Sequence, residues 1–279
     1  MIKGNVCNVT LEDVRPVLEM LRDNNFVIDE KNLCYSISEL LQSKTIKCMP
    51  NVQIKEYLGK GSFGTTFLAC YNRIDKSCGA LKIFQENIKD AKLEIKINKK
   101  AAKLDVAPKI YGQCSIKIGK KHVFFILSER MEQTLEKYLT TCKDRVQNGW
   151  LSITDFKDIL NHTCTLVISK IDTLSKNNIV HLDLSLNNIM VNVDDNNNIS
   201  DIKIIDYGIA KMYKKNVKIK NEKIIRNKEP YYSQYIQYFI SLLNIIEGIF
   251  KMHKIELLLY ICNIAKKNHI NIIDACIYE

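Results

Sequence analysis

The stretch NIVHLDLSLNNIMV, residues 178–191, is the most informative part of this sequence. It places Asp183 and Asn188 five residues apart, and the later stretch KIIDYG, residues 203–208, places Asp206 directly after an apolar strand pattern. A hairpin between the two stretches would bring these three side chains together. One carboxylate can then orient a hydroxyl group while the amide and the second carboxylate hold Mg²⁺ through oxygen. The spacing therefore predicts a phosphoryl-transfer site.

A glycine-rich stretch and a lysine precede this pattern. LGKGSFGTTF, residues 58–67, has Gly59, Gly61 and Gly64 in G-x-G-x-x-G spacing, which lets the backbone approach phosphate closely. The same spacing marks dinucleotide-binding folds, but there a helix follows, whereas here strand patterns lie on both sides. Lys82 lies on the next apolar strand, where its charge is costly unless it meets an anion or reaches water. Both features fit a nucleotide site.

In this order, the four elements resemble the eukaryotic-type protein kinase family and its atypical relatives over residues 52–210. The resemblance implies an α+β, two-lobed kinase-like fold with a small β-rich N-lobe and a mainly helical, shortened C-lobe. It also implies ATP and Mg²⁺ as cofactors. In such a site Asp183 is the catalytic base, Lys82 binds the α- and β-phosphates, and Asn188 and Asp206 hold the metal.

The resemblance extends to the remaining parts of an ATP site. Glu94, on a predicted helix, is the expected partner of Lys82; Glu86 is the alternative, but it leaves little chain to fold back. Ser128 would line the back of the adenine pocket. The implied ATP-binding residues are Gly59, Gly61, Ser62, Phe63, Gly64, Ala80, Lys82, Glu129 and Met131.

Several positions depart from the family pattern. Leu182 replaces the usual Arg before the base, and Ser185 replaces a Lys that would steady the transferred phosphate. Thr66 replaces the Val that covers adenine, and Tyr207 replaces the Phe of the metal motif. No Ala-Pro-Glu closes the activation segment, and Lys-Glu-Pro at 228–230 is a poor substitute. These changes put peptide recognition in doubt more than nucleotide chemistry.

The pattern divides the chain into an N-terminal helical extension at 1–50, an N-lobe at 51–131 and a C-lobe at 132–279. The predicted helices are 11–25, 38–43, 88–104, 132–139 and 154–176, followed by two apolar helices from residue 231. The predicted strands are 52–58, 65–71, 79–84, 109–119, 122–130, 188–193 and 201–207, of which the first five form one sheet.

The ten cysteines are scattered and contain no Cys-x-x-Cys pair, so free buried thiols in a reducing compartment are expected. The amino terminus has no apolar core or cleavage site of a signal peptide, and residues 235–250 are too short and too polar to span a membrane. The expected location is the cytoplasm. A composition rich in Ile, Lys and Asn suits a large DNA virus or an intracellular microbe.

The formal net charge of +10 favours acidic partners. Eight basic residues lie in one run: Lys211, Lys214, Lys215, Lys218, Lys220, Lys223, Arg226 and Lys228. If the run is more than a solvated loop, it predicts protein acceptors that are acidic or already phosphorylated. Nucleic acid is disfavoured, because only Tyr213 could stack on a base.

The predicted activity is transfer of the ATP γ-phosphoryl group to Ser or Thr hydroxyls of proteins. Two alternatives stay open. A small-molecule kinase of the aminoglycoside or choline type uses the same set of Asp, Asn and Asp side chains, and the presence of Ser185 favours this alternative. A pseudokinase that serves as a binding module is the other, although a scaffold has no physical need for all four polar residues.

Overall fold

The computed structural model describes residues 15, 18, 33–42, 49, 52–61, 64–71, 77–84, 88–118, 121–213, 224–246 and 263. The chain forms two compact units. The first contains residues 1–102 and 108–130, and the second contains residues 103–107 and 131–279.

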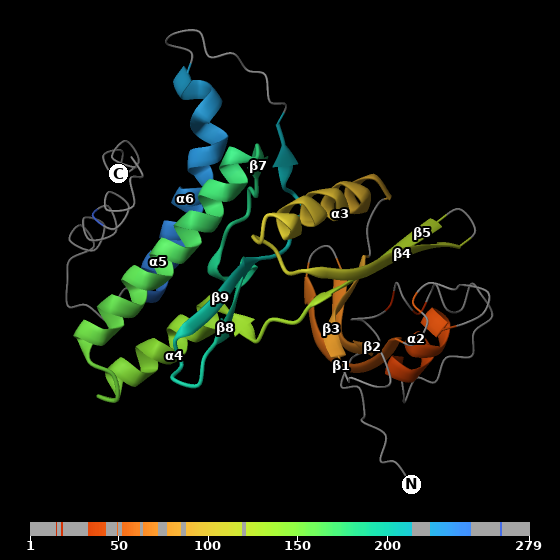
Figure 1. The fold of residues 1–279 in the computed structure, drawn as a ribbon, viewed down its shortest axis with the longest axis horizontal. Helices are drawn as coiled ribbons and strands as arrows, with labels where there is room; N and C mark the ends of the chain where they lie inside the picture. Colours follow the sequence, from red (N-terminus) through yellow and green to blue (C-terminus); the bar gives the residue numbers. More distant parts are fainter. Residues whose placement is uncertain are drawn as a thin grey trace. The chain divides into compact units, whose positions relative to one another are not determined.

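The first unit is built on a five-stranded antiparallel sheet with the order β1-β2-β3-β5-β4 (Figure 1). The strands are β1 (Val52–Gly61), β2 (Gly64–Tyr71), β3 (Ser77–Phe84), β4 (Ile110–Ile118) and β5 (Lys121–Glu129). Each of them overlaps a strand expected from the sequence. The predicted β-rich sheet is therefore confirmed.

Two helices bury the opposite faces of this sheet. Because side chains alternate along a strand, Leu81 of β3 packs in the cluster that includes α2 (Leu33–Gln42). Phe84 packs with α3 (Ile88–Lys103) on the other face. Each fully buried side chain of this size contributes about 1.5–3 kcal/mol. The alternation also places Lys82 on the same face of β3 as Phe84.

The helix α2 is longer than the predicted helix at 38–43. The Ser38 hydroxyl donates to the Cys34 carbonyl at 2.7 Å and accepts the Ile54 N–H of β1 at 2.8 Å. Ile37 and Leu41 are fully buried against the sheet, so tertiary packing extends this helix toward its N-terminus. Of the predicted helix at 11–25, only residues 15 and 18 are described, and both are helical.

The expectation of free thiols is wrong for part of this unit. Cys70 of β2 lies directly opposite Cys78 of β3, and the two form a disulfide. Cys34 and Cys114 are also disulfide-bonded. The register of the β2–β3 hairpin brings Cys70 and Cys78 together, because directly opposed residues of antiparallel strands have their Cβ atoms within about 5 Å of each other. In the second unit, Cys142 and Cys164 are buried free thiols, as expected.

Among its described residues, the second unit has three helices and several short strands (Figure 1). Its helices are α4 (Leu135–Gln147), α5 (Ile153–Lys176) and α6 (Ile224–Ile246), with a short 3₁₀ turn η1 (Leu186–Asn188). Its strands are β6 (Gln133–Thr134), β7 (Ile179–Val180), β8 (Ile189–Val193), β9 (Ile199–Ile204) and β10 (Lys211–Met212). The strands form a β6-β8-β9 sheet and a β10-β7 pair.

Side-chain caps fix where α4 and α5 begin. The Thr134 hydroxyl accepts the Lys137 N–H, and the Ser152 hydroxyl accepts the Asp155 N–H at 3.0 Å. Such a cap contributes about 1 kcal/mol by satisfying an N–H that has no partner inside the helix. The predicted helix at 154–176 is α5.

The segment 103–107 joins this unit through ion pairs. Asp105, at a positive φ of 59°, accepts hydrogen bonds from Lys203 of β9 at 2.6 Å and Lys170 of α5 at 3.0 Å. Burial alone would lower the pKa of Lys203, but its hydrogen bonds to Asp105 and Asp201 raise it. The Ile204 N–H also donates to the Val106 carbonyl at 2.8 Å, so this segment fixes the end of β9.

The C-terminal helix α6 starts earlier than the expected residue 231. The helix therefore includes the Lys-Glu-Pro at 228–230, and Pro230 lies inside it, where it has no N–H to donate to the carbonyl four residues earlier. The second predicted apolar helix lies outside the described residues. Among the described helices, none has the length and apolar character to cross a bilayer.

Candidate active site

The β1–β2 hairpin carries the glycine-rich stretch in the first unit. Gly61 pairs with Gly64, and Gly64 in turn faces Phe84 of β3. A Cβ at Gly64 would lie 2.4 Å from the Ile83 carbonyl oxygen, so only glycine permits this approach of β2 to β3. The expected site residues Ser62 and Phe63 lie outside the described residues.

Lys82 forms an ion pair with Glu94 across the sheet–helix interface. The Lys82 ammonium lies 2.6 Å from the Glu94 carboxylate and 5.0 Å from the Phe84 ring centroid. Glu94 is only 3% exposed and Lys82 21%. A carboxylate this deeply buried is costly without a partner, so the pair fixes the position of α3 against β3. The alternative Glu86 lies outside the described residues.

The expected adenine-side residues lie on neighbouring strands of the first unit and, along the chain, at the start of the longer segment of the second unit. Ala80 pairs with Ser128, whose hydroxyl donates to the Ala80 carbonyl at 3.3 Å. The Glu129 N–H donates to the Lys109 carbonyl at 2.7 Å, and the Glu129 carboxylate accepts the Lys109 N–H. Met131 is buried and belongs to the second unit.

In the second unit, Asp183 and Asn188 interact directly. The Asn188 amide nitrogen donates to the Asp183 carbonyl at 2.8 Å and to its carboxylate at 3.1 Å. These bonds turn the amide oxygen away from Asp183. The turn η1 connects the two residues, and the Asn188 N–H donates to the Ser185 carbonyl at 3.0 Å. The Asp183 side chain stays exposed and can reach an incoming group.

Asp206 joins this group through the β8–β9 hairpin. Ile189 of β8 faces Ile204 of β9, and the Ile205 N–H donates to the Asn188 carbonyl at 2.9 Å. Asn188 and Asp206 therefore flank the same end of the hairpin. Asp206 has a positive φ of 63°, a conformation that costs about 1 kcal/mol or more for a residue other than glycine. Strain of this kind is typical of functional sites.

A buried pair of rings lies beneath these carboxylates. His181 and Tyr207 are fully buried, with ring centroids 4.9 Å apart in an edge-to-face arrangement. Nε2 of His181 is 2.8 Å from the Ile205 carbonyl, which holds the backbone just before Asp206. Burial lowers the pKa of His181, which favours its neutral form. It acts as packing and as a backbone anchor.

Two glutamines of α6, which the sequence analysis missed, hold the backbone around Asp183. The buried Gln234 accepts the His181 N–H at 2.8 Å. Gln237 accepts the Leu184 N–H at 3.0 Å and donates to the Leu182 carbonyl at 2.9 Å. Leu182, where the family has Arg, has a positive φ of 67°. Gln234 and Gln237 are polar residues three apart on an otherwise apolar helix face, and this spacing could have indicated their role from the sequence.

The site residues thus fall into two groups, one in each unit. In the first unit, the ion pair with Glu94 fixes the position of the Lys82 ammonium group. In the second unit, Asp183, Asn188 and Asp206 supply two carboxylates and an amide oxygen, which are suitable ligands for Mg²⁺. Of the basic run, Lys211 lies in β10, while residues 214–223 lie outside the described residues. In the part of the chain that is described, no group of three or more His, Cys, Asp or Glu side chains is placed to hold a metal ion by itself.

Comparison with known proteins gives two findings. A family model described as protein kinase domain matches residues 52–233. The SNF1-related protein kinase catalytic subunit alpha KIN12 of Arabidopsis thaliana is similar, with 25% identity over 175 residues. That alignment covers 62% of this chain and 32% of the relative. The chain thus matches about a third of the length of this relative.

Proposed function

Because the chain belongs to the protein kinase family, we propose that it transfers the γ-phosphoryl group of ATP to Ser or Thr hydroxyls of proteins. The observation that carries the proposal is the bonding between Asp183 and Asn188. It leaves the Asn188 oxygen for a metal and keeps the Asp183 carboxylate exposed for an acceptor. Serine and threonine as acceptors are supported by the resemblance to a SNF1-related kinase.

The residues present fit magnesium and ATP. Asn188 and Asp206 supply the oxygen ligands that Mg²⁺ prefers, at one end of a hairpin. Bound Mg²⁺ would offset the charge of the phosphates. Lys82, held by Glu94, is proposed to bind the α- and β-phosphates, and Gly59, Gly61 and Gly64 to let the hairpin backbone cover them.

The proposed chemistry is mainly positioning. Asp183 accepts a hydrogen bond from the acceptor hydroxyl and orients its oxygen toward the γ-phosphorus. It takes the proton as the new P–O bond forms, while the bond from the γ-phosphorus to the bridging oxygen breaks and ADP leaves. Gln237 and Gln234 fix the backbone that carries Asp183. Ser185, in place of a lysine, leaves less positive charge for the transferred group, and a low turnover follows from this.

Partner and location remain part of the proposal. A protein substrate follows from the family, and the basic run at 211–228 supports an acidic or already phosphorylated acceptor. We place the activity in the cytoplasm.

Replacing Lys214, Lys215, Lys218 and Lys220 by Ser should lower the rate at which acidic peptides are phosphorylated relative to neutral peptides. An unchanged ratio of the two rates would contradict the proposed preference for acidic acceptors.

A mass-spectrometric assay tests the activity itself. The full chain with Mg-ATP should add phosphate to Ser or Thr of casein, a basic protein or itself, and Asp183→Asn should abolish this while ATP still raises the melting temperature. Transfer to aminoglycosides or choline but not to protein would identify a small-molecule kinase. Nucleotide binding without transfer would identify a pseudokinase, and either result overturns the proposal.

A further inference from the structure

The Cys70–Cys78 disulfide lies in the same row of side chains as residues proposed to bind nucleotide. Because side chains alternate along a strand, every second residue of β2 and β3 points to the same face of the sheet (Figure 1). Three successive pairs on this face are Cys70–Cys78, Leu68–Ala80 and Thr66–Lys82. Successive pairs are roughly 7 Å apart along the strands. The disulfide is therefore the direct neighbour of the pair that contains Ala80.

The other contacts of β2 and β3 are fixed by glycine. A Cβ at Gly79 would lie 2.3 Å from the Ser128 carbonyl oxygen, so β3 packs tightly on β5. At the far end of β2, Gly64 approaches the Ile83 carbonyl of β3 in the same way. The backbone thus holds β3 to β5 and one end of β2 to β3. The disulfide holds the other end of β2.

Both cysteines of this pair are partly exposed. A small thiol or disulfide reagent can therefore reach the bond in the folded protein. Disulfides in the cytoplasm, where we place the activity, are usually transient and serve catalysis or redox sensing. Position, access and compartment together favour a bond that opens and closes over one that is permanent.

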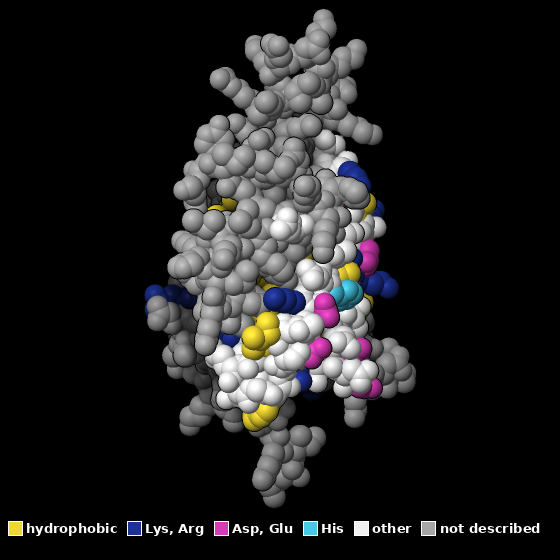
Figure 2. Space-filling view, turned by 90° about the vertical axis from the view of Figure 1, so that its left-hand side faces the viewer, with side chains coloured by type: hydrophobic (Ala, Val, Ile, Leu, Met, Phe, Trp, Pro, Cys, Tyr) yellow, Lys and Arg dark blue, Asp and Glu magenta, His cyan; other side chains and the backbone are white. Residues whose placement is uncertain are grey.

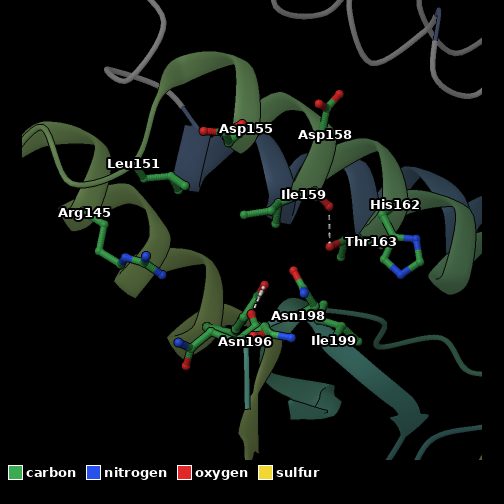
Figure 3. A pocket seen from close by; sticks show the side chains of 12 residues that line it. Arg145, Leu151, Asp155, Asp158, Ile159, His162, Thr163, Asn196, Asn198 and Ile199 are labelled. Carbon is green, nitrogen blue, oxygen red and sulfur yellow. Dashed lines mark hydrogen bonds between the residues drawn. The ribbon is translucent and has the colours of Figure 1, made fainter. Parts of the chain in front are cut away.

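The free thiols of the second unit do not have this access. Cys142 and Cys164 are buried, and burial raises the pKa of both thiols. Neither lines the cavity of about 540 Å³ between α4, α5 and the turn that joins β8 to β9 (Figure 3). On the surface drawn in Figure 2, the described apolar side chains, with cysteine coloured among them, lie in small separate groups. A reagent that opens the Cys70–Cys78 bond should therefore leave both thiols unchanged.

We propose that Cys70 and Cys78 form a reversible redox site that sets the affinity of the chain for ATP. The disulfide holds the Cys70 end of β2 against β3, whereas in the dithiol form this end moves about the Gly64 end. Nucleotide binding must then order β2, so the dithiol form binds ATP more weakly. The inference rests on the proposed function, because it concerns the same nucleotide-binding residues.

A dithiol reductant opens the bond by exchange. Its thiolate attacks one sulfur of the Cys70–Cys78 bond and expels the other, which takes up a proton. The second thiol of the reductant then breaks this mixed disulfide, which leaves two cysteine thiols and the reductant as an internal disulfide. Two electrons and two protons pass to the protein. A small disulfide oxidant reverses the exchange and leaves as two thiols.

Calorimetric titration of the full chain with a non-hydrolysable ATP analogue and Mg²⁺ tests the proposal. The oxidised form is compared with the form reduced by dithiothreitol, and thiol labelling with mass spectrometry establishes the state of Cys70 and Cys78 in each. Reduction should weaken binding about three- to tenfold, the effect of ordering one or two side chains. Oxidised glutathione should restore the affinity.

Two results of this titration overturn the redox site alone. One is equal affinity of the two forms in a chain that still transfers phosphate. The other is a Cys70–Cys78 bond that dithiothreitol opens only when the protein unfolds, which would identify a permanent structural bond. Absence of binding in both forms would instead refute the proposed kinase function together with the redox site.

Variants locate the effect, because the reductant also opens the bonds of Cys34 and Cys114. The double variant Cys70→Ser/Cys78→Ser should bind as weakly as the reduced parent and should not respond to dithiothreitol. Cys70→Ser alone breaks the same bond and serves if the double variant does not fold. As the matched control, Cys142→Ser removes a free thiol of the second unit and should keep the full response. A double variant that responds like the parent assigns the effect to other cysteines and refutes the site.

Discussion

Gln237 of α6 binds both peptide groups that flank Asp183. Its side-chain oxygen accepts the Leu184 N–H at 3.0 Å, and its nitrogen donates to the Leu182 carbonyl at 2.9 Å. A single amide therefore fixes the backbone on each side of the proposed base. It also holds Leu182 at its positive φ of 67°. The Arg that the family usually has at position 182 is thus not needed to hold the backbone conformation around Asp183.

Replacing Gln237 by Met should lower kcat with little change in the affinity for ATP. Methionine has a similar length but makes neither hydrogen bond, and each bond lost to a partly buried group costs about 1–3 kcal/mol. A loop displaced by a fraction of an ångström should reduce kcat roughly 10- to 100-fold. Steady-state kinetics at saturating ATP measures this change.

Gln237→Glu separates the two bonds, since it keeps the acceptor for the Leu184 N–H but places a carboxylate oxygen against the Leu182 carbonyl. Because two acceptor oxygens repel each other, it should also lower kcat. A Met variant with parental kcat would show that Gln237 does not position Asp183.

Removing Lys82 should destabilise the first unit as well as abolish turnover. Lys82→Met leaves the Glu94 carboxylate, 3% exposed, without this cation, and breaking such a buried pair costs about 3 kcal/mol or more. The double variant Lys82→Met/Glu94→Gln should recover part of the loss. Urea unfolding measures both, with Lys96→Met, an exposed lysine of α3, as the control. Equal stability of Lys82→Met and Lys96→Met would contradict the prediction.

Tyr207→Phe should raise the free energy of unfolding. The Tyr207 hydroxyl is fully buried and has no hydrogen-bond partner among the described residues. A buried hydroxyl without a hydrogen-bond partner lowers the free energy of unfolding by about 1–3 kcal/mol. Phenylalanine removes this hydroxyl and keeps the ring packed edge-to-face on His181. The gain should be about 1 kcal/mol in chemical denaturation. A loss of stability would mean that a partner, such as a buried water, satisfies the hydroxyl.

Reducing the Cys70–Cys78 disulfide should lower the stability of the β2–β3 hairpin. The bond closes a loop of about nine residues, for which chain entropy predicts about 2–3 kcal/mol. Thiol labelling with mass spectrometry, before and after reduction, measures which cysteines react. Cys70 and Cys78 should label only after reduction; labelling of both in the unreduced, folded protein would refute the pairing.

Cys164 provides an internal control in the same experiment. Burial raises the pKa of its thiol to about 12, so almost none of it is the reactive thiolate at pH 8. It should resist labelling whether or not the disulfide is reduced, and it should react only on unfolding. Early labelling of Cys164 would show that the second unit opens under the conditions used.

The sequence predicted the parts of the site that depend on local spacing. Asp183 and Asn188 are five residues apart, and Asp206 follows an apolar strand, so one hairpin suffices to group them. The sheet of the first unit was predictable for the same reason, because alternation and glycine mark each strand. The partner of Lys82 could be named only because a family resemblance suggested Glu94.

The contacts that were not predicted link distant positions. Gln234 lies 53 residues from His181, and Lys203 lies 98 residues from Asp105, so no local pattern connects them. The Cys70–Cys78 bond depends on the exact register of a hairpin, in which a slip of one residue would turn one cysteine to the other face. These contacts require the tertiary packing to be known.

The membership of residues 103–107 in the second unit has a consequence for dissecting the gene. A cut after Arg130 looks like the natural way to express the units separately, since the second unit resumes at Met131. Such a fragment would lack Asp105, which forms ion pairs with the buried Lys203 and the partly buried Lys170. It would also lack Val106, whose carbonyl accepts the N–H of Ile204 at the end of β9. The C-terminal fragment would need residues 103–107 supplied as a separate peptide or grafted to its start. The second unit is therefore not one continuous stretch of the chain, and no single cut in the gene separates the two units.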